Sequence, residues 1–251
     1  MIELVLMQSS HFQSVMSAPR EPCMLTWSTG HGCRCGMVWV DPKNLGYRPF
    51  FQRWLVLNVK DDPERLARLE ELFSKYVPEL VDWMMLGLIF GEYETKPRMV
   101  LPLTNLNLVV SLCHLLASCF QQAPDTEVKY VEGVFVACLT WSFGASLIQG
   151  EQKRFDFNLK KLSGMTGSDN AQVLGTSLPG QTKFTIFDYK YHLKNQNWVQ
   201  WSTEVQEFVP QPGAAFYQIL VPTADTVRST WLVETCVEVF RPSIFVGDPG
   251  Q

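Results

Sequence analysis

Positive charge is scarce in this 251-residue chain, which has 21 Lys and Arg against 25 Asp and Glu, a formal net charge of −4. Without a basic excess there is no overall field that would attract nucleic acid or acidic lipid. Charged residues make up only 18% of the chain, whereas 46% is hydrophobic, with 8 Trp and 16 Phe. Such a composition is typical of globular proteins rather than disordered ones. We therefore expect a folded chain of one or two domains that does not bind nucleic acid.

Long hydrophobic runs are equally few. The two longest uncharged stretches lie between Met99 and Asp125 and from Gly133 to Gln149. Proline and polar side chains interrupt the first, and the second is shorter than the roughly 20 residues that a spanning helix needs. The N-terminal residues also have neither the basic nor the apolar part of a signal peptide. We expect buried helices and no membrane association, with an integral membrane protein as a weaker alternative.

Cysteine occurs 7 times, an odd number, which does not suit a disulfide framework. Several cysteines sit in apolar runs, where Cys behaves as a small hydrophobic residue, and we expect a reducing compartment. His31, Cys33 and Cys35 resemble a metal cluster, but a zinc site needs four ligands and the next cysteine, Cys113, falls in an apolar helix. Free thiols and no metal site are expected.

Catalytic side chains form no recognisable group. Glu70 and Glu71 are expected on an exposed helix face, and His114 falls within an apolar helix as a core histidine. His192 lies in a strand-like stretch without a nearby Ser or Cys to activate. The sequence therefore offers no catalytic residue for nucleophilic chemistry.

Hydrophobic spacing predicts a mostly helical assembly over residues 37–163. One helical face is formed by Phe50, Phe51, Trp54 and Leu55. Asp62 with Pro63 forms a cap and first turn for the next helix. We expect that helix to end at Pro78, where another begins. Further helices are predicted at about Thr104 to Gln121, about Glu127 to Gln149, and Glu151 to Leu162, the last ended by Gly164.

The pattern changes after this assembly. Residues 163–181 are rich in Gly, Ser, Thr and Asn and are expected to form a loop, whereas no element is expected before Met37. Alternation predicts a strand from about Phe184 to Tyr191, paired with one at Trp198 to Trp201. The predicted elements that follow are a helix capped by Thr223 and a strand from Ser243 to Val246.

The strand at the carboxyl end leads into a glycine turn. A complete phosphate loop reads Gly-x-x-x-x-Gly-Lys-Ser/Thr, in which backbone N–H groups and the Lys bind the phosphates. With Gly247 first, Asp248 to Gln251 fill the variable positions, and the second Gly, the Lys and the hydroxyl residue would be 252–254. An ordinary turn is the alternative. No acidic Walker B strand is found either, so we expect no tight nucleotide binding and no hydrolysis by these residues.

Several stretches taken together resemble dynein heavy chains, most closely the axonemal ones. The resemblance covers about residues 34–250, and the order matches the passage from the end of the second AAA+ module into the third. The stretches are CGMVWVDPKNLGYRPFFQRW (35–54), LFSKYVPELVDW (72–83), LPLTNLNLVVSLCHLL (101–116), WSFGASL (141–147), KRFDFNLKKLSG (153–164), and ILVPTADTVRSTWLVE (219–234) followed by FVGDPG (245–250).

The resemblance implies a mainly α fold with a small α/β part, in which a helical AAA+ lid precedes the incomplete beginning of a P-loop AAA+ domain. The implied domains are a divergent, poorly structured leader (1–35), the lid of the second module (36–165), a linker loop (166–182) and the truncated start of the third module (183–251). The parent would be a minus-end-directed microtubule motor ATPase of cilia that uses ATP and Mg²⁺. Its implied partners are microtubules and other dynein chains, in the cytoplasm, cytoskeleton and ciliary axoneme.

Site residues are implied in the same way. Nucleotide contacts would come from Val221, Pro222, Thr223, Gly247, Asp248, Pro249 and Gly250, and Arg34 would act on a neighbouring module's nucleotide. Around Arg34 the sequence STGHGCRCG departs from the family, and Met1 to His31 show no resemblance. We expect a catalytically inactive fragment of a longer protein, whose helix 127–149 leaves apolar side chains exposed. A stand-alone, non-catalytic helical interaction module is the alternative.

Overall fold

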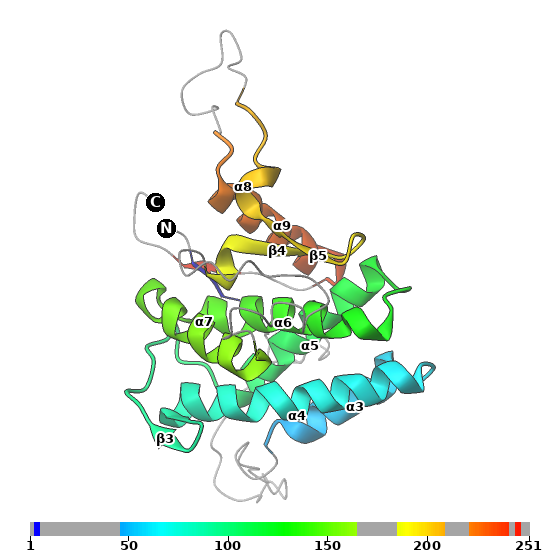
Figure 1. Cartoon of the computed structure of the whole chain (residues 1–251), viewed down its shortest axis with the longest axis vertical. Helices are drawn as coiled ribbons and strands as arrows, with labels where there is room; N and C mark the ends of the chain where they lie inside the picture. The colour runs from blue at the N-terminus through cyan, green and yellow to red at the C-terminus, as the bar shows by residue number, and fades with distance from the viewer. Residues whose placement is uncertain (1–2, 6–45, 165–184, 209–220, 241–243, 247–251) are drawn as a thin grey trace, which may run out of the picture.

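The computed structural model describes residues 3–5, 46–164, 185–208, 221–240 and 244–246. Its elements form three layers (Figure 1), and the described chain is mainly helical with small antiparallel sheets, as predicted. No described helix is long and apolar enough to cross a bilayer. The first layer holds α3 (Arg48–Asn58) and α4 (Pro63–Leu86); the second holds α5 (Asn105–Gln122), α6 (Val131–Ser142) and α7 (Gln149–Ser163); the third holds β4 (Tyr189–His192), β5 (Asn197–Gln200), α8 (Trp201–Glu204) and α9 (Ala224–Glu238).

Helix α4 begins where the sequence predicts. The Asp62 carboxylate accepts a hydrogen bond from the Arg65 amide at 2.9 Å, and Pro63 occupies the first turn, where no N–H is required. The predicted end at Pro78 is wrong, because the helix continues to Leu86. Tyr76, Val77, Leu80 and Val81 are buried on both sides of the proline. Their burial offsets the missing hydrogen bond, which costs roughly 3 kcal/mol in a helix interior.

The second layer follows the predicted helices with one correction. Helix α5 starts near the predicted Thr104, which caps it, and α7 ends at the predicted Gly164, which adopts φ 81°. The helix predicted at 127–149 is shorter: α6 covers Val131–Ser142 and is flanked by 3-10 turns at Val128–Tyr130 and Gly144–Ser146.

Helix α6 is buried on all sides, so the expectation of exposed apolar side chains there is wrong. Phe135 faces Tyr76 of α4 with ring centroids 6.0 Å apart. On another side, a Cβ added at Gly133 would lie 2.5 Å from the ring of Tyr191, so only glycine lets β4 approach this closely. The first and third layers therefore enclose α6 from opposite directions.

One buried carboxylate joins α6 to α4. Glu132 is only 3% exposed and accepts hydrogen bonds from the Tyr76 hydroxyl at 2.6 Å, Lys75 Nζ at 2.9 Å and Arg68 Nη2 at 2.7 Å. Burial, together with the hydrogen bond to Glu132, raises the pKa of Tyr76 well above its usual range. The phenol therefore remains a proton donor, and the carboxylate is fully partnered.

The strands are short. Strands β4 and β5 pair antiparallel with Tyr191 opposite Trp198, as predicted, although Ile186 lies in a 3-10 turn rather than in the strand. Strand β6 (Ile244–Val246), expected from the sequence, pairs antiparallel with β1 (Glu3–Val5), so the expectation of no element before Met37 is wrong at this strand. A hairpin of β2 (Leu88–Ile89) and β3 (Glu92–Tyr93), which was not predicted, follows α4.

Candidate functional site: the junction of the helical layers with α9

The residues proposed to contact adenine lie at the start of α9. Thr223 caps this helix as predicted, Val221 is 49% exposed, and Pro222 is half-buried. The phosphate-loop residues and the proposed trans-acting arginine lie outside the described residues, so their position relative to Val221 remains a prediction. These residues are Gly247, Asp248, Pro249, Gly250 and Arg34.

The first turn of α9 is held by its own side chains. The Thr226 amide donates to Thr223 Oγ1 at 3.2 Å, and the Thr223 amide donates to Thr226 Oγ1 at 2.7 Å, which is a reciprocal capping arrangement. Asp225 pairs with Arg228 one turn later. The cap therefore fixes Thr223 at the start of α9, and the exposed Val221 precedes it by two residues.

Helix α9 is docked on the end of α5 by hydrogen bonds. The Ser118 hydroxyl donates to the Thr235 carbonyl at 2.9 Å, and both residues are buried. Gln122, in the last turn of α5, donates to the Glu238 carboxylate. Leu232 and Cys236 add buried apolar contact area on α9. This face of α9 is therefore occupied by the preceding helical layer.

Aromatic rings continue the contact from α9 into α6. Trp231 of α9 lies 5.6 Å from Trp201 of α8, which lies 6.2 Å from Trp141 of α6, measured between ring centroids. Lys190 of β4 places its ammonium 5.4 Å from the Trp201 ring and 5.9 Å from the Trp231 ring. The indoles and the cation together tie β4, α6, α8 and α9 into one unit.

The cations Lys190 and Arg228 both have partners in this junction. Lys190 forms an ion pair with Glu204 at 2.8 Å, and Arg228 lies over the Trp141 ring at 5.6 Å. Sequence reasoning missed the roles of Lys190 and Trp201, because it placed them in a hairpin without saying what the hairpin packs against. The sequence signal that could have indicated these roles is a lysine in a half-buried strand, close in sequence to Trp198 and Trp201.

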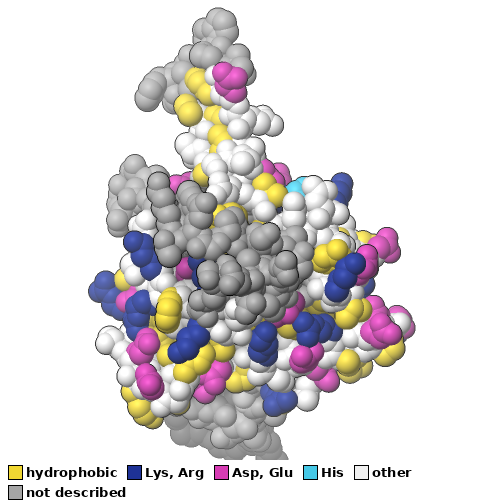
Figure 2. Space-filling model, viewed as in Figure 1, with side chains coloured by type: hydrophobic (Ala, Val, Ile, Leu, Met, Phe, Trp, Pro, Cys, Tyr) yellow, Lys and Arg dark blue, Asp and Glu magenta, His cyan; other side chains and the backbone are white. Residues whose placement is uncertain are grey.

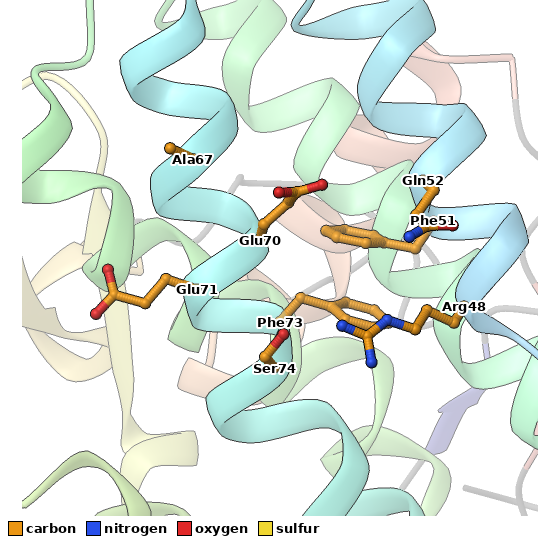
Figure 3. Close-up of a pocket in the computed structure, with 8 residues that line it drawn as sticks. All are labelled: Arg48, Phe51, Gln52, Ala67, Glu70, Glu71, Phe73 and Ser74. Atoms are coloured by element: carbon orange, nitrogen blue, oxygen red, sulfur yellow. The ribbon is translucent and has the colours of Figure 1, made fainter.

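The hollows of the described surface include one on the first layer and one beside α9. A groove of about 390 Å³ runs between α3 and α4 (Figure 3). Its floor is the stacked pair Phe51 and Phe73, with centroids 3.7 Å apart. Arg48 borders it on α3, and Glu70 on α4 points toward Phe51, whereas Glu71 points away from α3. Glu70, the carboxylate directed into the groove, offsets the charge of Arg48, so the groove offers no net positive charge to a phosphate.

The second hollow, of about 310 Å³, lies between the β4–β5 turn and α9. Lys190, His192 and Lys194 line one wall, and Glu234 and Glu238 line the other. The Asn195 amide donates to His192 Nδ1 at 3.3 Å. On the visible face of the molecule, basic and acidic side chains are interspersed rather than gathered by sign (Figure 2).

No group of His, Cys, Asp or Glu among the described residues could hold a metal ion. His31, Cys33 and Cys35 lie outside those residues. Glu70 and Glu71 are exposed as predicted, and His114 is half-buried in α5. The described cysteines are buried and form no disulfide; they are Cys113, Cys119, Cys138 and Cys236.

A helical unit that carries the first helix of a following α/β unit is the arrangement of an AAA+ lid followed by a P-loop region. Comparison with protein families matches residues 69–203 to the dynein heavy chain AAA lid domain and residues 208–251 to the P-loop containing dynein motor region. The chain belongs to the dynein heavy chain AAA lid family. The two matches meet between 203 and 208, later in the chain than the linker that composition suggests.

Relatives of known identity agree with these matches. The chain is 36% identical over 222 residues to the Dynein-1-alpha heavy chain of the flagellar inner arm I1 complex of Chlamydomonas reinhardtii, and 37% identical over 221 residues to human dynein axonemal heavy chain 10. It is 31% identical over 225 residues to human dynein axonemal heavy chain 2. Each alignment covers 86% of this chain but only 5% or 4% of the relative. The chain thus corresponds to a small part of the heavy chains it matches.

Proposed function

We propose that this chain is a segment of an axonemal dynein heavy chain that joins the lid of the second AAA+ module to the beginning of the third. The parent is a minus-end-directed microtubule motor of cilia and flagella, driven by ATP with Mg²⁺. It assembles with other dynein chains in the ciliary axoneme. One observation carries the proposal: the lid and P-loop families of dynein match in tandem along a chain whose α9 is docked on the lid helices.

The role of the segment follows from that docking. Helix α9 precedes β6 and the glycine turn at Gly247, so its position on α5 sets where the P-loop region begins relative to the lid. Val221, Pro222 and Thr223 would border the adenine, Gly247, Asp248, Pro249 and Gly250 would begin the phosphate loop, and Arg34 would reach a neighbouring module's nucleotide. No catalytic side chain is proposed within these 251 residues.

The test compares this chain with a longer one. We expect the transcript to encode Gly-Lys-Ser or Gly-Lys-Thr in frame at the positions following Gln251. A chain extended through the third module should bind Mg-ATP in a calorimetric titration, whereas the 251-residue chain should neither bind ATP tightly nor hydrolyse it. A different reading frame after Gln251, or Mg-dependent hydrolysis by the purified 251-residue chain, would contradict the proposal.

A further inference from the structure

Two thiols meet where α5 packs on α6. The Cys138 thiol donates a hydrogen bond to Cys119 Sγ, with the sulfurs 3.7 Å apart. The two residues are 2% and 4% exposed, respectively. A disulfide holds its sulfurs about 2.05 Å apart, so the pair is in contact but not bonded. The sulfurs would have to move roughly 1.7 Å closer for a bond to form.

We propose that Cys119 and Cys138 form an intramolecular disulfide when an oxidant of the peroxide class reaches them, covalently linking α5 to α6. A small oxidant suits the site because both sulfurs are buried. Cys119 accepts the hydrogen bond and lies in the last turn of α5, whereas Cys138 lies inside α6. Cys119 is therefore the sulfur that attacks peroxide, and Cys138 is the one that completes the disulfide.

The chemistry proceeds in two balanced steps. The Cys119 thiolate attacks one peroxide oxygen, the O–O bond breaks, and the leaving hydroxide takes a proton to become water, which leaves a sulfenic acid on Cys119. The Cys138 sulfur then attacks the Cys119 sulfur, the S–S bond forms, and the S–O bond breaks. The hydroxyl leaves with the Cys138 proton as a second water. One peroxide thus oxidises two thiols and is itself reduced to two waters.

The location of Cys119 controls access to the pair. Its carbonyl accepts the Ala123 amide at 3.0 Å, the capping bond that closes α5, and helix ends open more readily than their middles. Helix α9 rests on the same end through Ser118 and Gln122. Burial, and next the Cys119 sulfur, hold the pKa of Cys138 well above its usual range. The closed structure therefore reacts slowly, and opening of the α5 end sets the rate.

Cys113 provides a matched control on the same helix. It is 0% exposed, and it makes no sulfur contact within the described part of the chain. Burial also raises the pKa of its thiol well above the usual range. Cys113 is therefore buried like Cys119 but lacks, among the described residues, a sulfur partner such as Cys138. A reaction that depends on the proximity of two sulfurs should not form a disulfide at Cys113.

The experiment treats the purified 251-residue chain with hydrogen peroxide, blocks remaining thiols with iodoacetamide, and maps tryptic peptides by mass spectrometry. Trypsin cleaves after Lys129, which separates Cys138 from the peptide that contains both Cys113 and Cys119. Cys113→Ser should leave the linked peptide pair unchanged, whereas Cys119→Ala and Cys138→Ala should abolish it. In the native chain this link should exceed every other cysteine pair by about tenfold, and guanidinium should remove the preference.

Two results would overturn the proposal. One is a linked peptide that joins Cys138 to a cysteine other than Cys119 in the monomeric native chain. The other is peroxide oxidation that yields only singly oxidised thiols, or none, at both positions. Circular dichroism verifies that each variant folds, and the native chain with Cys113→Ser decides the question even if the Cys119 and Cys138 variants do not fold.

Discussion

At the scale of single residues, Glu132 shows how a buried charge is tolerated in the lid. The side chain of Glu132 is 4% exposed, whereas the side chains of Arg68 and Lys75 are 28% and 37% exposed. The two cations still reach water without Glu132, but Glu132 cannot reach water without them. Loss of the cations should therefore be more damaging than loss of the carboxylate, although either change breaks the same ion pairs.

We predict this asymmetry in urea denaturation. Arg68→Met with Lys75→Met leaves Glu132 buried beside only the Tyr76 hydroxyl and should lower the free energy of unfolding by about 3–5 kcal/mol. Glu132→Gln keeps a partner for Tyr76 and should cost about 1–2 kcal/mol.

The triple variant, with all three substitutions, tests the reason. It should recover part of the loss seen in the double variant, because the unpaired charge is then gone. Equal losses for Glu132→Gln and for the double variant would show that burial of the charge is not the source of the effect.

At the scale of secondary structure, α4 contains an internal proline that interrupts the hydrogen bonding of the helix. Pro78 lies inside the helix and cannot donate to the carbonyl four residues earlier, on Ser74. Pro78→Ala restores that donor and should raise the free energy of unfolding by about 1–3 kcal/mol, measured by urea denaturation.

Pro63 of the same helix is the matched control. It occupies the first turn, where the missing N–H has no helical partner, so Pro63→Ala should leave the free energy of unfolding unchanged or slightly lower. If both alanine variants raised stability equally, the gain would come from general helix propensity rather than from the restored hydrogen bond.

Local sequence signals predicted where several helices begin, but not the features that depend on long-range packing. Caps predicted the start of α4 at Asp62 and of α9 at Thr223, and apolar spacing placed the start of α5 at about Thr104. The continuation of α4 past Pro78 depends on packing against distant helices, and β1 exists only through its pairing with β6 at the other end of the chain. Neither contact leaves a local pattern.

The candidate site was likewise predictable only in part. The cap at Thr223 was predictable, because a hydroxyl and an acidic first turn mark a helix start. The docking of α9 was not, because it joins Ser118 and Thr235, which are far apart in sequence. The roles proposed for Val221 and for the glycine turn remain predictions, since they depend on a ligand.

At the scale of the whole molecule, α9 of the P-loop region packs on the lid through contacts centred on Trp201. Trp201 stands between Trp141 of α6 and Trp231 of α9, and Lys190 adds its ammonium to the same rings. Further links to α9 are the hydrogen bonds at the end of α5, the buried Leu232 and Cys236, and the contact of Arg228 with Trp141. Removing the central indole should therefore loosen α9 while α4, α5 and α6 stay packed.

Hydrogen exchange measured by mass spectrometry can detect this local loosening. In Trp201→Ala, amides of α9 should exchange about tenfold faster or more. The helix loses the contact between Trp231 and Trp201, and Lys190 loses one of the two rings that it contacts. Amides of α6 should stay protected. Trp54→Ala removes a comparably buried indole from α3 (7% exposed) and should leave α9 unchanged. Equal acceleration throughout the chain would mean that Trp201 supports one global core. Faster exchange confined to α9 would mean that this first helix of the P-loop region can detach from an intact lid, with Trp201 as the contact that holds it in place.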